Sequence, residues 1–362
     1  MEGLRAYAVV LVFCVHFFDH YFDRFRGIDF DSFHVGDAES AFELVSYYIR
    51  SSHYGVDLFF LLSGFLICRI VSRDGFSYIT FLLNRLIRLY PAFAFALILH
   101  IGYAAYCWDV TYDVRTIVEN IFLLHGIWEL GITPIIVPTW SLTYEWLFYL
   151  GFPVLMLCIA RGRAFSPWQI VFCAVLVLVA ISAIGPQYVR FLMFFVGAGL
   201  ACIPIEALRG SILRIPDTAV LITVVAVNFI FVVDQNYYHF IWIYAVTSAL
   251  LVVKVIHGKG ILTNVFCSLP LRTLGNLSYS FFLLHGLAVI IVVDHAGSTI
   301  ASTSEPLRIL LLLSGSFCLS AFAAACSYLV FERPYFIRRA RASNAMRVVL
   351  PPNHELNCCV ER

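Results

Sequence analysis

Apolar residues in this chain form long runs that alternate with short polar connections. Each run has roughly the 20 residues that a helix needs to cross a hydrocarbon layer of about 30 Å. Such a pattern predicts an all-α fold, a polytopic transmembrane helical bundle of about ten spans. Allowing a few residues of error at each end, the runs cover 4–22, 54–71, 89–107, 141–160, 168–185, 189–206, 217–234, 238–257, 277–294 and 307–331.

The composition agrees with a membrane protein and excludes other classes. Of 362 residues, 61% are hydrophobic and 13% are charged, whereas about 25% of residues are charged in soluble domains. A formal net charge of +1 argues against nucleic acid as a partner. The first apolar run begins almost at Met1 without a cleavage-site pattern, so we interpret it as a span and not as a signal peptide. We expect residues 1–341 to form one transmembrane domain and residues 342–362 to be a disordered cytoplasmic tail.

Lysine and arginine are distributed unevenly between the two ends of the predicted spans. Basic residues favour the cytoplasmic side of a membrane, and the bias predicts that both termini are cytoplasmic. With this orientation, only six of the 24 basic residues lie outside: Arg24, Arg26, Arg50, Arg115, Arg190 and Arg308. The long aromatic connection at about 108–140 then lies outside, where we expect a short helix and a cap over the outer mouth of the bundle.

The eleven cysteines lie mostly in apolar runs, where a free thiol behaves as a small hydrophobe. No Cys-x-x-Cys pair or Cys/His cluster has the spacing of a zinc site. His16, Asp19 and His20 are suitably spaced for a metal, but no further ligand stands out. We therefore predict no metal site, no disulfide framework and no permanently bound cofactor.

The first run contains two ionisable residues, Arg5 and His16. Ten residues separate them, so on a helix rising about 1.5 Å per residue the imidazole lies roughly 16 Å further along the axis. His16 would then be near mid-membrane, where ionisable groups are costly and a functional role is the default hypothesis. The alternative is that the imidazole only hydrogen-bonds a neighbouring helix and helps the two helices to pack.

The second run carries Asp57 near its outer end and Ser63 beside Gly64 in an otherwise bulky segment. One interpretation is a close approach of helices around a substrate path, with Asp57 as a polar partner of His16. The other is that the small residues pack helices together and that Asp57 interacts with the helix dipole.

The fourth run carries a carboxylate, Glu145. Counted from the outer face, Glu145 lies about one helical turn inside the apolar slab, level with Asp57 and not far above His16. We interpret it as a functional residue or a partner of His16. A structural ion pair and snorkelling to the interface are the alternatives.

Two arginines mark the start of the third run. Arg85 and Arg88 are three residues apart, so on a helix they share a face at the cytoplasmic boundary, where two guanidinium groups can bind phosphate. The alternative is the ordinary anchoring of a span by basic residues.

The last two runs also contain polar residues. His285 lies about 12 Å deep by helical rise in the ninth run, and core packing and pocket lining are both open for it. The tenth run ends at Phe-Glu-Arg-Pro, where Pro334 stops the helix and Glu332 can pair with Arg333 at the interface.

Taken together, these segments resemble the acyltransferase 3 family of integral membrane acyltransferases, which O-acylate bacterial surface polysaccharides, lipopolysaccharide O-antigens, Nod factors and macrolides. The matching blocks follow one another along the whole chain, which makes the resemblance far more specific than any single block. They are Arg-x10-His at Arg5 and His16, Gly-Val-Asp-Leu-Phe-Phe-Leu-Leu-Ser-Gly-Phe-Leu-Ile from Gly55, Arg-x-x-Arg-x-x-Pro from Arg85, Trp-Ser-Leu-x-x-Glu-x-x-Phe-Tyr from Trp140, Leu-Ser-Tyr-Ser-x-x-x-Leu-His ending at His285, and the terminal Phe-Glu-Arg-Pro.

The resemblance implies transfer of an acyl group from acyl-CoA, most often acetyl-CoA, to a sugar hydroxyl of a cell-surface polysaccharide or its lipid-linked precursor, at the bacterial inner (cytoplasmic) membrane. On this interpretation Arg5, Arg85 and Arg88 bind the donor as a co-substrate. His16 acts as a general base or as a nucleophile. Glu145 or Asp57 orients its ring. The residues expected to line the substrate pocket are Ser63, Trp140, Ser141, Tyr149, Tyr279 and His285.

Two other functions are compatible with part of the pattern. A polytopic transporter or flippase could use His16, Glu145 and His285 as a proton relay, and an inert scaffold of a polysaccharide-assembly complex needs none of them. Because Arg85 and Arg88 have no evident duty in a proton relay, the pair favours the acyltransferase.

Overall fold

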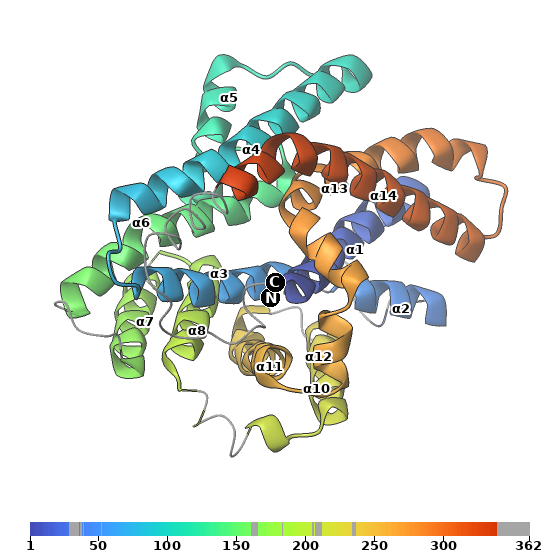
Figure 1. Cartoon of the computed structure of the whole chain (residues 1–362). Helices are drawn as coiled ribbons and strands as arrows, with labels where there is room; N and C mark the ends of the chain where they lie inside the picture. Colours follow the sequence, from blue (N-terminus) through green and yellow to red (C-terminus); the bar gives the residue numbers. More distant parts are fainter. Residues whose placement is uncertain are drawn as a thin grey trace.

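The computed structural model describes residues 1–338, except 29–35, 37, 39, 52, 161–165, 183, 205, 207–211 and 234–236. Over these residues it contains helices and no strands (Figure 1). The expected tail at 342–362 and the end of the expected domain at 339–341 lie outside the described residues. The longer helices are α1 (Glu2–Arg26), α2 (Ala41–Arg50), α3 (Gly55–Val71), α4 (Tyr78–Trp108), α6 (Trp140–Ala160), α7 (Pro167–Ser182), α8 (Phe191–Cys202), α10 (Asp217–Val233), α11 (Tyr237–His257), α13 (Leu269–Thr299) and α14 (Glu305–Ser327).

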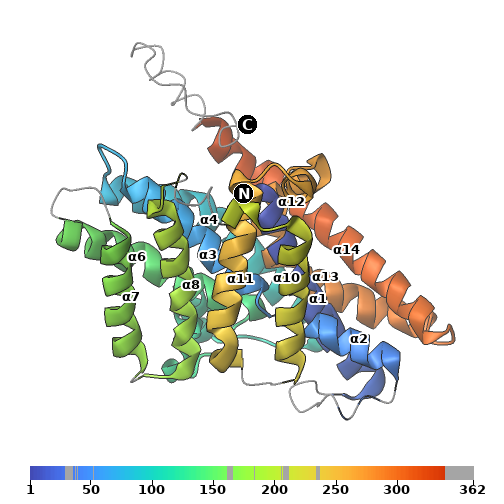
Figure 2. The same ribbon diagram turned by 90° about the horizontal axis from the view of Figure 1, so that it is seen from below.

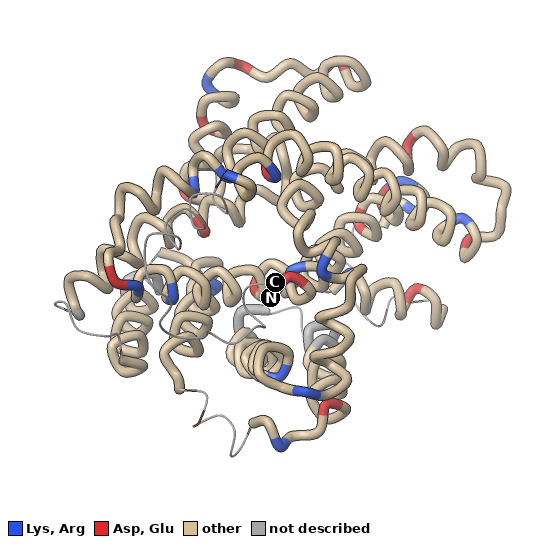
Figure 3. The backbone as a smooth tube through the Cα atoms, in the orientation of Figure 1, with Lys and Arg blue, Asp and Glu red and all other residues tan. Residues whose placement is uncertain are grey.

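The predicted transmembrane helical bundle is confirmed. Within the described chain, seven helical stretches are long and apolar enough to cross a membrane, and three further apolar helices are shorter. Each of the ten predicted runs overlaps one of these helices, and the short ones correspond to α7, α8 and α10. Neither α7 nor α8 carries a lysine, arginine, aspartate or glutamate (Figure 3).

Helix α1 lies at the centre of the bundle, packed along α13 and against α3. Its Phe13 ring is edge-on to Phe281 of α13 at 5.8 Å and to Phe317 of α14 at 5.6 Å between centroids, a geometry that adds to the gain from burying apolar area. Close to the start of α13, Gly275 lies against the backbone of Glu2. Contacts with α13 therefore run along α1 and fix the direction in which its side chains point.

The two ends of α1 are held differently. Arg26, in its last turn, donates to Glu43 of α2 at 2.8 Å and to Glu305 at the start of α14 at 2.6 Å. Arg5, in its first turn, lies within electrostatic range of Glu332 in the π-helical turn η7 (Tyr328–Glu332) that continues α14. Helix α14 is therefore antiparallel to α1.

Four helices form a row beside this centre. Figure 2 shows α7, α8, α11 and α10 standing side by side, each in contact with the next. Helix α8 also packs along α3, which ties the row to the centre of the bundle.

Helices α3 and α8 approach each other through glycine. A Cβ atom built on Gly64 would collide with the backbone of Phe194, and one built on Gly197 would collide with the backbone of Leu61. Small residues let helix backbones come together in this way inside membranes. Of the two interpretations of the second run, helix packing therefore describes Gly64.

The connection between α4 and α6 turns into the bundle. It contains the predicted short helix, α5 (Val114–Ile121), followed by the 3-10 turns η2 (Leu124–Gly126), η3 (Trp128–Leu130) and η4 (Val137–Thr139). The Asn120 side chain joins α5 to the segment before η4 by donating to the carbonyls of Thr116 and Thr133 and accepting from the amide of Ile135. Pro138 of η4 lines the same cavity as His16, so α6 starts beside the first span.

Replacing Gly64 with leucine is expected to destabilise the protein by about 1–3 kcal/mol, because the new side chain forces α3 away from α8. The matched control is Gly151→Leu on α6, where an added Cβ meets nothing within 4 Å. Thermal unfolding in detergent measures both, and equal midpoints for the two variants would contradict the packing described here.

Candidate functional site

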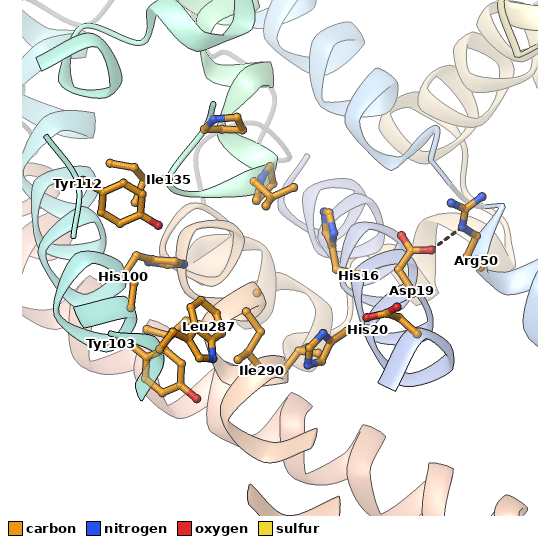
Figure 4. Close-up of a pocket in the computed structure, with 18 of the residues that line it drawn as sticks. His16, Asp19, His20, Arg50, His100, Tyr103, Tyr112, Ile135, Leu287 and Ile290 are labelled. Carbon is orange, nitrogen blue, oxygen red and sulfur yellow. Dashed lines mark hydrogen bonds and ion pairs between the residues drawn. The ribbon is translucent and has the colours of Figure 1, made fainter. Parts of the chain in front are cut away.

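His16 opens onto a large cavity that has several polar side chains in its walls. Two adjoining hollows of about 590 and 400 Å³ share His16, Asp19, Arg50, Val137 and Pro138 in their walls, and we call them together the histidine cavity. In Figure 4, His16 and Asp19 extend from α1, while His100 and Tyr103 of α4 lie on the far side. Asp19 accepts a hydrogen bond from Arg50 Nε at 2.6 Å.

The imidazole of His16 is held by shape and not by hydrogen bonds. Among the described residues, no side chain or carbonyl hydrogen-bonds either of its ring nitrogens. Its ring lies 5.2 Å from that of His285, centroid to centroid. His53 lies in the wall of the same cavity. The nitrogens of His16 are thus available to a ligand or to a neighbouring imidazole.

Asp57 forms a buried ion pair. Its Oδ2 atom lies 2.9 Å from a terminal nitrogen of Arg190, and its side chain is fully inaccessible. Arg190 also lies over the Trp140 ring, 5.2 Å from the centroid. Arg190 and Trp140 both line the histidine cavity, so this ion pair forms part of its wall.

A second, much narrower pocket of about 50 Å³ lies around Arg5, and we call it the arginine pocket. Glu145 accepts a hydrogen bond there from Ser63 at 2.6 Å and another from Tyr149. The Nε atom of Arg5 is buried without a hydrogen-bond partner among the described residues. Expected pocket residues that line it are Ser63, Ser141 and Tyr279.

The position of Glu145 differs from the sequence-based estimate. We expected it level with Asp57 and near His16, whereas it lies in the arginine pocket and hydrogen-bonds Ser63 and Tyr149. The estimate counted inward from the membrane surface, but η4 brings the start of α6 to the depth of His16. Five residues later Glu145 lies about 7.5 Å further along its helix, where it lines the same pocket as Arg5.

Arg85 and Arg88 contact aromatic rings instead of carboxylates. Arg85 lies 5.4 Å from the Phe81 centroid and 5.2 Å from that of Tyr149, and Arg88 lies 5.3 Å from that of Phe336. The Nε atom of Arg88 is buried and unpaired within the described chain. Arg88, Glu145 and Tyr149 all act electrostatically on Arg5. The structure therefore brings the three predicted donor-binding arginines into one region.

The other end of this region is a shallow hollow of about 220 Å³ next to Arg85. The start of α4 forms part of its wall. There Ser77 caps the helix by accepting a hydrogen bond from the Thr80 amide. Polar residues dominate its wall: Arg73, Asp74, Ser77, Thr80, Asn84, Arg85 and Tyr335.

Two further expectations can be compared with the structure. His285 is fully buried and lies behind His16, outside the residues that line either pocket. Glu332 was expected to pair with Arg333, but it is buried and accepts a hydrogen bond from Ser280 at 2.6 Å, while Arg333 is exposed. The π-helical turn at Tyr328–Glu332 carries the carboxylate inward.

Several polar wall residues of the histidine cavity were missed. Arg50, His53 and Arg190 lie at the ends of helices or in connections, so the sequence predicted only that the two arginines lie on the outer side and did not link any of the three to His16. His100 lies inside the third run, but nothing in its spacing links it to His16. Across the described part of the chain, no group of three or more His, Cys, Asp or Glu side chains is arranged to hold a metal ion.

Comparisons with known proteins identify similarity to acyltransferases. A family model described as an acyltransferase domain (Acyl_transf_3) matches residues 1–325. The Bacillus subtilis (strain 168) protein named "Putative peptidoglycan O-acetyltransferase YrhL" is 24% identical over 335 aligned residues, which cover 79% of this chain and 47% of that protein. The chain thus spans about half the length of this relative. No solved structure matches the present chain.

Replacing Arg190 with methionine is expected to cost about 3–5 kcal/mol of stability, because Asp57 then keeps a buried charge without its ion-pair partner. The double variant Arg190→Met with Asp57→Asn should recover much of that loss, since both charges are gone. Thermal unfolding in detergent compares them, and a double variant no more stable than the single one would show that the ion pair does not carry this energy.

Proposed function

This chain belongs to the acyltransferase family whose model matches residues 1–325, and on that basis we propose that it is a membrane-bound O-acyltransferase. The proposed donor is acyl-CoA, and acetyl-CoA is the favoured one. The proposed acceptor is a sugar hydroxyl of a cell-surface polysaccharide or its lipid-linked precursor. The Bacillus relative is named for O-acetylation of peptidoglycan, and the similarity to it supports an acetyl group and a carbohydrate acceptor.

Three guanidinium groups without acceptors carry the donor assignment. In the described structure, no carboxylate or carbonyl accepts a hydrogen bond from Arg5, Arg85 or Arg88. Arginine prefers a bidentate anion such as carboxylate or phosphate, and Glu145 and Glu332 act electrostatically on Arg5 without forming a hydrogen bond to it. Phosphates of coenzyme A would supply bidentate partners for the three arginines. Plain anchoring by basic residues explains this less well, because anchoring arginines reach toward water.

The shape of the arginine pocket suits the rest of the donor. About 50 Å³ is too little for a nucleotide but suits an extended chain such as pantetheine. The hydroxyl group of Ser278 has no partner in the described structure, and the oxygens of Ser63 and Ser141, which donate to Glu145 and Pro138, can still accept from its amides. Val56 lines both the arginine pocket and the histidine cavity. A thioester carried along this path would arrive next to His16.

The acceptor would occupy the histidine cavity, whose aromatic and polar walls suit a sugar. As a general base, His16 would take the hydroxyl proton while that oxygen forms a bond to the thioester carbon. The carbon–sulfur bond then breaks, and the proton passes from His16 to the departing thiolate. As a nucleophile, His16 would attack the thioester carbon, and the carbon–sulfur bond would break to release the thiolate and leave an acyl-imidazole. The hydroxyl oxygen would then take the acyl group from the imidazole nitrogen, and its proton would pass to the thiolate. Both routes need a free nitrogen on His16.

The transporter alternative has less support. A proton relay needs His16, Glu145 and His285 in sequence, but Glu145 hydrogen-bonds Ser63 and Tyr149 in the other pocket. We assign the protein to a bacterial inner membrane with both termini in the cytoplasm, since coenzyme A thioesters are made on that side and the basic residues favour it.

Replacing His16 with alanine is expected to abolish acyl transfer, since it removes the only group assigned to proton or acyl transfer. Purified protein incubated with radiolabelled acetyl-CoA and a cell-wall glycan extract reports thiol release and label transfer. His295→Ala, an exposed histidine on α13, is the control and should retain activity. Unchanged turnover in His16→Ala would reject the site.

Replacing Arg88 with glutamine is expected to raise the KM for acetyl-CoA about tenfold to a hundredfold, because a hydrogen bond between charged groups contributes about 1.5–3 kcal/mol. The KM for S-acetyl-pantetheine, which lacks the nucleotide phosphates, should not change. The control is Arg333→Gln, an exposed arginine close in sequence to Glu332. An equal rise for both donors would show that Arg88 does not bind the phosphates.

A further inference from the structure

His285 is held in one tautomer by its own helix. Its Nδ1 atom lies 2.8 Å from the carbonyl oxygen of Phe282 and 3.2 Å from that of Phe281. Because a carbonyl oxygen only accepts hydrogen bonds, Nδ1 carries the proton. The Nε2 atom is then a lone-pair acceptor.

This acceptor is buried and unused. Within the described residues, Nε2 of His285 has no hydrogen-bond partner, and leaving a buried acceptor unsatisfied costs about 1–3 kcal/mol. Aromatic rings enclose the imidazole, with the centroids of Phe13, Phe281 and Phe282 at 6.4, 6.1 and 6.0 Å. Those rings have no N–H or O–H group to offer. The imidazole next to it that does have one is His16.

We propose that His285 is a positioning residue that accepts a hydrogen bond from His16 and thereby fixes which nitrogen of His16 carries its proton. The ring centroids lie 5.2 Å apart. Hydrogen-bonded nitrogens lie about 3 Å apart, and two imidazoles joined in that way have centroids at about the separation seen here. Because the Nε2 atom of His285 has no hydrogen-bond partner in the described structure, the proposal requires the His16 ring to turn toward it.

The consequence for His16 follows from its two nitrogens. With one N–H directed at His285, the other nitrogen keeps its lone pair toward the histidine cavity, where the proposed function needs it. When His16 takes a proton from a hydroxyl, the N–H facing His285 stays hydrogen-bonded. A carboxylate has this task in a serine protease triad. Here Glu145 and Asp57 are engaged with Ser63 and Arg190, so a neutral acceptor takes the place of the carboxylate.

Other titratable groups around His16 remain the same in every variant below, so they do not affect the comparison. These groups come from α1, α2, the connection before α3, α4, the connection between α4 and α5, α6 and η5 (Pro186–Arg190). They are Asp19, His20, Asp23, Arg50, His53, His100, Tyr103, Tyr112, Tyr144 and Arg190.

The test measures the reactivity of His16 directly. Diethyl pyrocarbonate modifies an unprotonated imidazole nitrogen, and peptide mass spectrometry of the purified full-length protein gives the rate at His16 between about pH 5 and pH 8. His285→Phe keeps an aromatic ring without an acceptor, and His285→Gln keeps an acceptor oxygen. The control is His295→Phe, whose Nδ1 also bonds a carbonyl of α13 at 3.0 Å but whose ring is exposed.

We expect His285→Phe to slow modification of His16 about tenfold and to move its pH midpoint, while kcat falls about tenfold and the KM for acetyl-CoA is unchanged. His285→Gln should restore most of the modification rate of His16 and most of kcat. His295→Phe should behave as the wild-type protein. If His285→Phe does not fold, His285→Met gives the same comparison. A wild-type rate and midpoint at His16 in a folded His285→Phe or His285→Met protein overturns the proposal.

This inference rests on the proposed function only for its catalytic consequence. Failure of that function gives a different result: the wild-type protein releases no thiol from acetyl-CoA, although the modification rate of His16 still depends on His285. If the wild-type protein releases thiol but the modification rate of His16 is the same with and without His285, only the positioning role is rejected.

Discussion

The energetic cost of removing guanidinium groups from water governs the arrangement of this bundle. Arginine stays charged at any ordinary pH, so each one in the interior requires an anion, a π-surface or a ligand. Arg190 and Arg26 are matched by carboxylates, and those pairs hold helices together. Arg85 and Arg88 rest on aromatic faces, which compensate less than a carboxylate does. The difference separates the charges that stabilise the fold from those assigned to the proposed donor site.

The bundle could be predicted from sequence because apolar run length is a local property. The same holds for Arg5 and His16, since ten intervening residues on one helix fix their separation along its axis. The pairing of Asp57 with Arg190 spans 133 residues, and no spacing rule relates such positions. The depth of Glu145 could not be obtained either, because it depends on a connection that folds inward instead of staying at the surface.

The position of His16 depends on α1 more than on any group bonded to its ring. Phe13, one turn earlier, is wedged between Phe281 and Phe317, and Gly275 brings α13 against the start of α1. Packing therefore determines where the imidazole lies, while the nitrogen that faces the histidine cavity stays free for chemistry. A site built on rigid helices in this way needs few hydrogen bonds of its own to be precise.

The narrowness of the arginine pocket affects more than the donor. A wide passage between a basic vestibule and the histidine cavity would let ions leak and would dissipate the electrochemical gradient that a cell maintains across its membrane. Where Val56 and Phe282 border the pocket, apolar side chains leave about 50 Å³, and a thin acyl-bearing arm would fill that gap while it reacts. On the proposed function, the bundle would keep the membrane electrically sealed at the point where acyl groups cross it.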